Sequence, residues 1–434
     1  MHKHSVPETE RNTLISAILI ALQDSVFVDS FHKYEKNVDL VEAMLKACSI
    51  VLEKNEISDT RKGTILHEYS KIQHNQKLTS ENIKDKSKKK NAPNIILKNL
   101  IHDLKNSVLP SIKENDFDIL GRFYREFIRY AGSDAKTGLV LTPSHITDLF
   151  CELADLNYND IVYDPCCGTG GFLVSAMKYM LNKSGNDINE WKEIKQNRLI
   201  GVEERSDMFT HACSNMMMRG DGKSNIHNGD CFDDEIIETI KSHNPNKGFL
   251  NPPYSVGSDG QLEFIENTLE CLVKGGECIA ICQMSTAIKQ DNKTIEVRKR
   301  LLKNHTLEAV FSMPDQLFYP EGVVTSILVF TANIPHPSNK EVFFGYFKDD
   351  GHILRKHKGR LDDGSWERKK EHMLNLYMNN KPEPGLSVTR CIEAEDEWCA
   401  EAYMETDYSE LTKEDFTKTI KDFVAFQFVS SKDE

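Results

Sequence analysis

Short apolar segments alternate with helical patterns between residues 136 and 335, and this alternation constrains the fold more than any other feature of the chain. The predicted strands are Ile161–Tyr163, Leu199–Val202, Asn225–His227, Gly248–Leu250, Cys278–Cys282, Leu307–Phe311 and Thr325–Thr331, and the predicted helices are Gly171–Leu181, Asp207–Arg219, Gln261–Val273 and Thr294–Leu302. This order predicts an α/β fold with a mainly parallel sheet covered by helices on both faces. Because such sheets bind ligands beyond the carboxyl ends of their strands, the residues after each strand are candidates for a functional site.

The chain before this region, residues 1–135, is predicted to be a helical domain. Apolar side chains recur at helical spacing in Asp39–Leu52, Asn94–Leu109 and Phe117–Tyr130. The polar stretch Thr79–Pro93 contains Lys84, Lys86, Lys88, Lys89 and Lys90. Such a charge run is usually a solvated linker, and a loop that contacts phosphate groups is the alternative.

The chain after this region, residues 336–434, is predicted to be a small α+β extension. Val342–Phe347 and His352–Lys356 flank Asp349-Asp350-Gly351, a pattern that predicts a β-hairpin. Trp366–Met378 and Glu410–Phe428 are predicted helices.

Composition indicates a soluble globular protein of two or three domains. The 434 residues are 39% hydrophobic and 28% charged. No apolar run is long enough to span a membrane and the N-terminus lacks a signal-peptide pattern, so we expect a cytoplasmic protein without a membrane segment. The eleven cysteines include no CxxC pair, so reduced thiols and no metal site are expected. The net charge of −13 means that any DNA-binding face must be local or supplied by a partner.

A glycine-rich turn follows the first predicted strand and opens a helix. It reads Asp164-Pro165-Cys166-Cys167-Gly168-Thr169-Gly170-Gly171-Phe172. Glycines let the backbone turn tightly and approach a ligand, but the spacing is not the G-x-G-x-x-G of dinucleotide-binding proteins. A carboxylate at the strand's end would repel a pyrophosphate, whereas it suits the ammonium group of a methionine moiety.

Two further acidic residues follow the next two strands. Glu203 ends the second strand, where a carboxylate can accept hydrogen bonds from both hydroxyls of a ribose. Asp230 follows the third possible strand and could accept a hydrogen bond from an adenine amino group. Each acid alone is more readily explained as a solvated loop residue, but their shared register at one edge of a sheet favours a ligand site.

Asn251-Pro252-Pro253-Tyr254 follows the fourth strand. Two consecutive prolines cannot lie inside a central strand or a helix, so they form a stiff corner. An amide, a free carbonyl and an aromatic ring on such a corner could hold a planar nitrogen heterocycle by its exocyclic amine. An ordinary strand-terminating turn is the alternative when the tetrapeptide is considered alone.

Taken in order, these motifs resemble class I S-adenosylmethionine-dependent methyltransferases, and in particular the modification subunit of type I restriction-modification systems. The resemblance covers residues 115–335 best. The segment Gly138-Leu139-Val140-Leu141-Thr142-Pro143 resembles the family's contact with the methionine end of the cofactor, and Met313-Pro314-Asp315-Gln316-Leu317-Phe318 lies in a block that resembles the one after the catalytic loop. The implied cofactor is S-adenosylmethionine (SAM), and its implied contacts are Thr142, Pro143, Asp164, Gly168, Thr169, Gly170, Gly171, Phe172, Glu203 and Asp230.

The resemblance implies a Rossmann-like methyltransferase domain over residues 136–335 and a DNA adenine-N6 methyltransferase activity. Asn251, Pro252, Pro253 and Tyr254 would be the catalytic residues. Two acceptors, the Asn251 side-chain carbonyl and the Pro252 backbone carbonyl, would free the lone pair of the adenine amine, and Tyr254 would stack on the flipped base, with Phe318 as a second candidate ring. No covalent intermediate is needed, so Cys166 and Cys167 are expected to be structural.

The resemblance also implies the partners. These are double-stranded DNA, a separate specificity subunit that reads the target, a complex that can contain two modification subunits, and a restriction subunit. The helical first domain and the C-terminal extension are the expected docking regions. Two alternatives stay open: methylation of an RNA base or of a protein glutamine amide, and a catalytically silent binding subunit.

Overall fold

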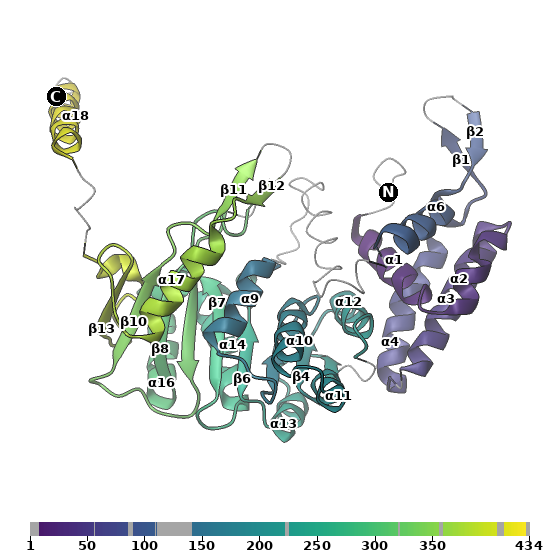
Figure 1. The fold of residues 1–434 in the computed structure, drawn as a ribbon, viewed down its shortest axis with the longest axis horizontal. Helices are drawn as coiled ribbons and strands as arrows, with labels where there is room; N and C mark the ends of the chain where they lie inside the picture. The colour runs from purple at the N-terminus through teal and green to yellow at the C-terminus, as the bar shows by residue number, and fades with distance from the viewer. Residues whose placement is uncertain are drawn as a thin grey trace.

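A computed structural model describes residues 8–55, 57–85, 90–108, 110, 141–221, 225–319, 322–355, 359–405 and 412–430 (Figure 1). The predicted helix Phe117–Tyr130 and the predicted segment Gly138–Val140 lie outside the described residues.

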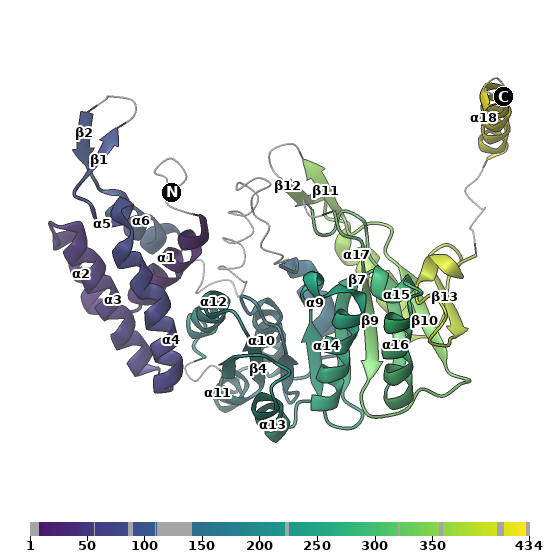
Figure 2. The same ribbon diagram turned by 180° about the vertical axis from the view of Figure 1, so that it is seen from behind.

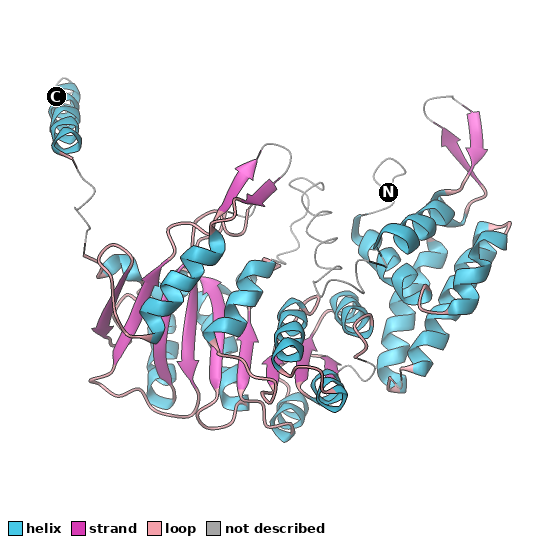
Figure 3. Cartoon of the chain, viewed as in Figure 1, coloured by secondary structure: helices cyan, strands magenta, loops and turns pink. Residues whose placement is uncertain are grey.

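A nine-stranded sheet forms the centre of the molecule (Figure 3). Its order is β13-β10-β8-β9-β7-β6-β3-β4-β5. The strands are β3 (Val162–Asp164), β4 (Leu199–Glu203), β5 (Asn225–Asn228), β6 (Lys247–Leu250), β7 (Glu277–Gln283), β8 (Thr306–Ser312), β9 (Thr325–Thr331), β10 (Glu341–Tyr346) and β13 (Ser387–Cys391). Strand β9 runs antiparallel to both neighbours, β7 and β8, and β13 runs antiparallel to β10, while the other pairs are parallel. The predicted mainly parallel α/β sheet is confirmed.

Helices cover both faces of the sheet because the strands are apolar on both faces. In β7, Ile279 and Ile281 join one core, whereas Cys278, Ala280 and Cys282 join another. The helices α9 (Ser144–Leu153), α10 (Gly171–Lys183), α12 (Ser206–Met217) and α17 (Trp366–Met378) contribute to the first core, and α14 (Gly257–Cys271) and α16 (Asn292–Asn304) contribute to the second. Figures 1 and 2 show the two helical layers from opposite sides. Three other helices of this region are α11 (Ile188–Asn197), α13 (Asp234–Ser242) and α15 (Ser285–Ile288).

The described residues between Glu8 and Val108 are mainly helical. The elements are α1 (Glu8–Ala21), α2 (Ser25–Ser30), η2 (Phe31–Lys33), α3 (Asn37–Lys54), α4 (Asp59–Ser70), η3 (Lys71–His74), α5 (Gln76–Thr79), α6 (Ile96–Asp103) and the π-helical turn η4 (Leu104–Val108). The stretch predicted to be a linker instead contains two antiparallel strands, β1 (Asn82–Asp85) and β2 (Lys90–Pro93). Lys84 lies in β1 and Lys90 in β2, whereas Lys86, Lys88 and Lys89 lie outside the described residues.

Three buried hydroxyl groups join the helical region to the sheet region. Ser16 Oγ lies 2.8 Å from both Tyr69 Oη and Ser214 Oγ, and Tyr69 Oη lies 2.7 Å from Ser214 Oγ. Ser16 and Tyr69 belong to α1 and α4, and Ser214 belongs to α12 against the sheet. All three side chains are buried, and Ser214 Oγ also donates to the Thr210 carbonyl at 2.7 Å, so the three hydroxyls form one hydrogen-bonded group between the two regions.

The C-terminal region extends the sheet. Its elements are β10, β11 (His352–Arg355), β12 (Gly359–Asp362), α17, β13, η7 (Ala400–Ala402) and α18 (Lys413–Ser430). The predicted hairpin between Val342–Phe347 and His352–Lys356 is wrong, because β10 pairs with β8 and β13 whereas β11 pairs with β12. The fully buried guanidinium of Arg298 in α16 lies 5.1 Å from the ring of Trp398 and anchors this region to the core.

In the part of the chain that the structure describes, no single helix is long and apolar enough to cross a membrane. One bent pair, Glu10–Ala21 with Ser25–Lys33, meets the criterion together by length and composition only, at an angle of 98°.

Candidate functional site

Four adjacent parallel strands, β6, β3, β4 and β5, bring their carboxyl ends to one edge of the sheet. Asp164 and Glu203 are the last residues of β3 and β4. Asn251 directly follows β6, and Asp230 lies two residues after the end of β5. The strand order therefore gathers four side chains that lie far apart in the sequence. This edge is where open α/β sheets bind ligands.

The glycine-rich turn between β3 and α10 depends on left-handed backbone at two positions. Gly168 has φ +56° and Gly170, the N-cap of α10, has φ +83°. Both values lie in the region where a Cβ causes strain. Because the chain reverses sharply here, the first turn of α10 directs its backbone N–H groups toward the edge of the sheet.

Asp164 lies beneath this turn and is 1% exposed. Its Oδ1 accepts a hydrogen bond from the Cys166 backbone N–H at 3.1 Å. Burial raises the pKa of Asp164 well above its ordinary value, although that hydrogen bond opposes the change. A nearby cation would reverse the shift, so the position suits a positively charged ligand group.

A hollow of about 50 Å³ adjoins Asp164 and the glycine turn. We call it the small hollow, and its lining residues are Leu141, Thr142, Asp164, Cys166, Cys167, Gly168, Thr169, Gly171, Phe172 and Asn251. Most of the residues predicted to contact the methionine end of a cofactor therefore meet in one place.

Glu203 forms hydrogen bonds with two loops. Its Oε2 accepts from the Gly168 N–H at 2.9 Å and its Oε1 accepts from the Arg205 N–H at 2.9 Å. Burial raises the pKa of Glu203 to about 7, and the two backbone hydrogen bonds only partly oppose this. The carboxylate thus ties the glycine turn to the end of β4.

A second cavity, of about 480 Å³, lies beside Glu203 and is called the large hollow here. It is lined by Pro165, Cys166, Glu203, Glu204, Arg205, Gly229, Asp230, Cys231, Phe232, Asn251, Pro252, Pro253, Tyr254, Ser255, Val256 and Phe264. Asp230 Oδ1 accepts from the Phe232 N–H at 3.0 Å, and Phe232 meets Phe264 edge to face at 4.8 Å. The volume falls within the ordinary range for small-molecule and cofactor sites.

The Asn251–Tyr254 corner forms the wall between the two hollows. Asn251 and Cys166 line both of them. Asn251 Nδ2 donates to Thr142 Oγ1 at 3.0 Å, an assignment that directs the amide nitrogen toward Thr142. The Cys166 thiol donates to the Asn251 backbone carbonyl at 3.5 Å, so the glycine turn and the corner are in direct contact.

Tyr254 and Phe318 lie together at the far side of the corner. Their ring centroids are 6.0 Å apart and their planes are nearly perpendicular, at 89°. Phe318 is only 4% exposed, whereas Tyr254 lines the large hollow. Tyr254 is therefore the ring available to a ligand, and Phe318 supports it from the core.

The sequence prediction missed two groups of lining residues, the aromatic pair Phe232 and Phe264 and the polar residues Glu204 and Arg205. Phe232 is 41% exposed and follows Asp230 by two residues, so an acid–aromatic pair after a strand was the available signal. The prediction also included Pro143 and Gly170, which bound the small hollow as the N-caps of α9 and α10 rather than lining it.

The two hollows differ in the groups that they present. The small hollow offers a buried carboxylate, and the large hollow offers Glu203, Asp230 and an exposed aromatic ring. Asn251, which donates to Thr142, lines both hollows.

Comparisons with known proteins identify the family and the fold. The family model described as N-6 DNA Methylase matches residues 115–432. The chain is 39% identical over 433 residues to the Type II restriction enzyme and methyltransferase RM.BcgI of Heyndrickxia coagulans, covering 96% of this chain and 66% of that protein. It is 24% identical over 258 residues to the Type I restriction enzyme EcoEI methylase subunit of Escherichia coli, covering 55% and 52% of the two chains.

Solved structures share the fold. A chain from a type I restriction-modification system matches with a TM-score of 0.65 and 18% identity, covering 99% of this chain and 93% of its own length. The methyltransferase subunit of a type I system from Streptococcus thermophilus matches with a TM-score of 0.61 and 15% identity, covering 87% and 79%. The class I methyltransferase fold predicted from the sequence is confirmed, and the chain belongs to the N-6 DNA methylase family.

Proposed function

We propose that this chain transfers a methyl group from SAM to the exocyclic N6 amine of an adenine in double-stranded DNA, as the modifying part of a restriction-modification system. One observation carries the proposal: Asn251 lines both the small and the large hollow. A group bound on either side would meet the amide of this residue. The family match supports adenine as the base.

Asp164, Glu203 and Asp230 are proposed to hold SAM. The buried Asp164 carboxylate would pair with the ammonium group, and the first turn of α10 would donate N–H groups to the methionine carboxylate. Glu203 would accept from the ribose hydroxyls and Asp230 from the adenine amine. The Phe232 ring would cover one face of the cofactor's purine.

When bound, SAM supplies an electrophilic methyl group on a sulfonium. The adenine amine is a poor nucleophile because its lone pair is delocalised into the ring. The Asn251 side-chain carbonyl and the Pro252 backbone carbonyl would each accept one N–H, which favours a tetrahedral nitrogen with an available lone pair. As the new N–C bond forms and the C–S bond breaks, the surplus amine proton passes to solvent, and alignment of the reacting atoms provides most of the rate enhancement.

The target base would have to leave the helix to reach this corner. Tyr254 is the proposed stacking partner, because its ring borders the large hollow and is fixed from behind by Phe318. The two prolines would keep the main chain of the corner rigid while the base binds.

A separate specificity subunit is proposed to read the DNA sequence. The net charge of −13 disfavours tight DNA binding by this chain alone. Helix α18 carries Phe416, Ile420, Phe423 and Val424 at helical spacing on one face, each between 46% and 63% exposed. An apolar stripe of this kind is typical of a helix that packs against a partner. A second modification subunit and a restriction subunit are the further partners proposed from the type I relatives.

The test is a transfer assay with tritiated SAM on DNA that lacks methylated adenine, on RNA and on protein, using the chain purified with its native partners. We expect label in DNA, recovered as N6-methyladenine. Label confined to RNA or to protein glutamine would contradict the proposal and favour the alternative substrates.

A further inference from the structure

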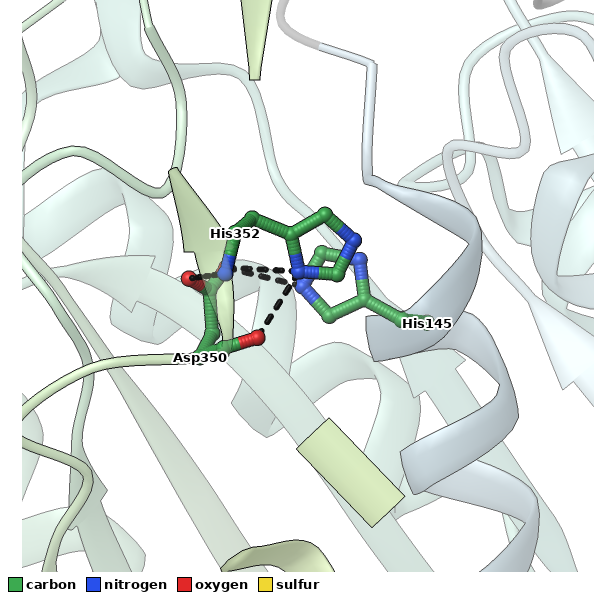
Figure 4. A group of neighbouring side chains, drawn as sticks. All are labelled: His145, Asp350 and His352. Carbon is green, nitrogen blue, oxygen red and sulfur yellow. Dashed lines mark hydrogen bonds and ion pairs between the residues drawn. The ribbon is translucent and has the colours of Figure 1, made fainter. Parts of the chain in front are cut away.

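Figure 4 shows His145, Asp350 and His352, which belong to a cluster of polar and charged side chains that line neither hollow. Asp350 is 1% exposed and lies between β10 and β11. His145 Nε2 donates to Asp350 Oδ2 at 2.9 Å, and its ring stacks on that of His352 with centroids 4.1 Å apart. Arg360 of β12 donates to both carboxylate oxygens of Asp350. The cluster thus joins the start of α9 to the base of the β11–β12 hairpin.

Two histidines and a carboxylate could also be ligands for a transition metal. In this cluster the Asp350 carboxylate already accepts from Arg360 and from His145. The Nδ1 of His352 lies 2.7 Å from the Asp350 backbone oxygen. A cation would have to displace a guanidinium from its two hydrogen bonds, so the arrangement is that of a charge-paired network.

One path from this network reaches Asn251. His145 is the second residue of α9, and Thr142 lies three residues before it, next to the N-cap Pro143. Thr142 Oγ1 accepts from Asn251 Nδ2 at 3.0 Å. The hydrogen bond between His145 and Asp350 therefore helps to fix the segment that orients the Asn251 amide.

A second path reaches Tyr254. Arg360 Nη1 donates to the Leu317 backbone carbonyl at 3.1 Å as well as to Asp350 Oδ2 at 2.8 Å. Phe318, the next residue, meets Tyr254 edge to face. Because Arg360 is anchored by Asp350, the loop that supports the Tyr254 ring is anchored too.

We propose that Asp350 and Arg360 are positioning residues for methyl transfer, which hold the Thr142 segment and the Leu317–Phe318 loop on the two sides of the Asn251–Tyr254 corner. The inference rests on the proposed function. Neither residue lines either hollow, and both would act through segments that line the hollows or support their walls.

The protonation states of Asp350 and His145 preserve the hydrogen bonds of the network at neutral pH. Burial alone would raise the pKa of Asp350, but the hydrogen bonds from His145 and Arg360 and the positive charge of Arg360 outweigh it and hold the pKa below its ordinary value. The carboxylate therefore stays ionised and accepts from both partners at neutral pH. Burial, together with the nearby His352 and Arg360, lowers the pKa of His145 below its ordinary value although Asp350 opposes the change, so the ring is a neutral Nε2–H donor at neutral pH.

The test compares Asp350→Asn, Arg360→Lys and the double variant Asp350→Asn/Arg360→Gln in the complex with native partners. The double variant leaves no unpaired buried charge, so it serves if Asp350→Asn alone does not fold. We expect the single-turnover rate of methyl transfer to unmethylated plasmid DNA to fall by about 10- to 100-fold in each folded variant, since small misplacements of reacting groups cost that much. The dissociation constant for SAM should change less than about threefold.

Glu277→Gln is the matched control. It removes another partly buried ion pair, Glu277 with Lys247 at 2.9 Å, but at the amino ends of β7 and β6. Its transfer rate should equal that of the wild type. A wild-type transfer rate in any folded Asp350 or Arg360 variant overturns the inference. A loss of transfer rate that is matched by an equal loss of SAM affinity and by a loss of thermal stability overturns it too, because it would indicate general disruption of the fold. Absence of DNA methylation by the wild-type complex would instead contradict the proposed function, and this inference with it.

Discussion

The two hollows at the edge of the sheet differ in size and in the side chains that line them. The small hollow is enclosed by a left-handed glycine turn, a fully buried carboxylate and the start of a helix, and it measures about 50 Å³. The large hollow measures about 480 Å³ and is bordered by partly exposed apolar side chains, Phe232 and Val256 among them. Backbone hydrogen bonds of 2.9–3.1 Å hold the carboxylates of Asp164, Glu203 and Asp230 in place. The large hollow still has room for bulky planar groups.

This difference in size and lining predicts that the two hollows bind different parts of the ligands. The small hollow is preorganised for one charged end of a ligand, whereas the large hollow has the size and the aromatic walls to take purines. Substitutions in the wall shared by both hollows should affect chemistry, substitutions in one hollow should affect ligand binding, and substitutions that touch neither the hollows nor the Asp350 network should affect only stability. The following predictions test that ranking, from the largest expected effect to the smallest.

Asn251→Ala should have the largest effect because Asn251 belongs to the shared wall. We expect the methyl-transfer rate to fall by about 10²- to 10³-fold, as for loss of a directly acting hydrogen-bonding group, while SAM binding survives. Single-turnover transfer and calorimetry measure the two quantities. Asn197→Ala, at an exposed position in α11, is the control and should match the wild type. Undiminished transfer by Asn251→Ala would refute the catalytic role.

Asp164→Ala should affect the small hollow alone. Loss of a hydrogen-bonded pair with a charged group is worth roughly 1.5–3 kcal/mol, so SAM affinity should fall by about 10- to 100-fold. Asp234→Ala, at an exposed acid in α13, should leave the affinity unchanged. Calorimetric titration gives both values, and normal affinity in Asp164→Ala would exclude the ammonium role.

Glu203 should make SAM binding depend on pH. Its pKa of about 7 lies above the ordinary value, so the free protein is protonated there below pH 7. If the ionised carboxylate accepts from the ribose, binding must release that proton, and affinity should fall by up to about tenfold per pH unit below 7 and level off above it. The same titration of Glu203→Gln corrects for ionisation of the cofactor. A wild-type profile that parallels the variant's would show that Glu203 does not contact the ligand in its ionised form.

Tyr69→Phe should have the smallest effect on the site. It removes the hydroxyl that Ser16 and Ser214 share, outside both hollows. Two buried hydroxyls would lose a partner, which costs roughly 1–3 kcal/mol in the free energy of unfolding. Chemical denaturation measures this cost. Affinity for SAM should not change, and a clear loss of affinity would mean that the helical region acts on the site.

The sequence predicted the parts of the fold that depend on local pattern. Apolar segments bounded by turn residues located β3, β4, β6 and β7, and the polar residues after them identified Asp164, Glu203 and Asn251. The prediction succeeded because the carboxyl ends of parallel strands share one edge of the sheet. Residues that directly follow such strands therefore come close together, whatever their distance in the sequence. The roles assigned to these residues stay predictions until the variants are measured.

Features that depend on long-range pairing were not predictable. The β-hairpin around Asp350 was misplaced because β10 finds its partners in β8 and β13, which no local turn signal reveals. The hydrogen bond between His145 and Asp350 joins residues 205 positions apart. Phe232 was missed because a single aromatic residue after an acid has no periodicity to mark it.

The contact of Cys166 with the corner has a further consequence. A thiol beside a methyl donor is itself a potential acceptor, and a thiolate would be a far better nucleophile than an adenine amine. Burial, reinforced by the negative charge of Asp164, raises the pKa of Cys166 well above its ordinary value and keeps the sulfur protonated. In the proposed complex with SAM, burial of this thiol would therefore protect the chain from methylating its own cysteine.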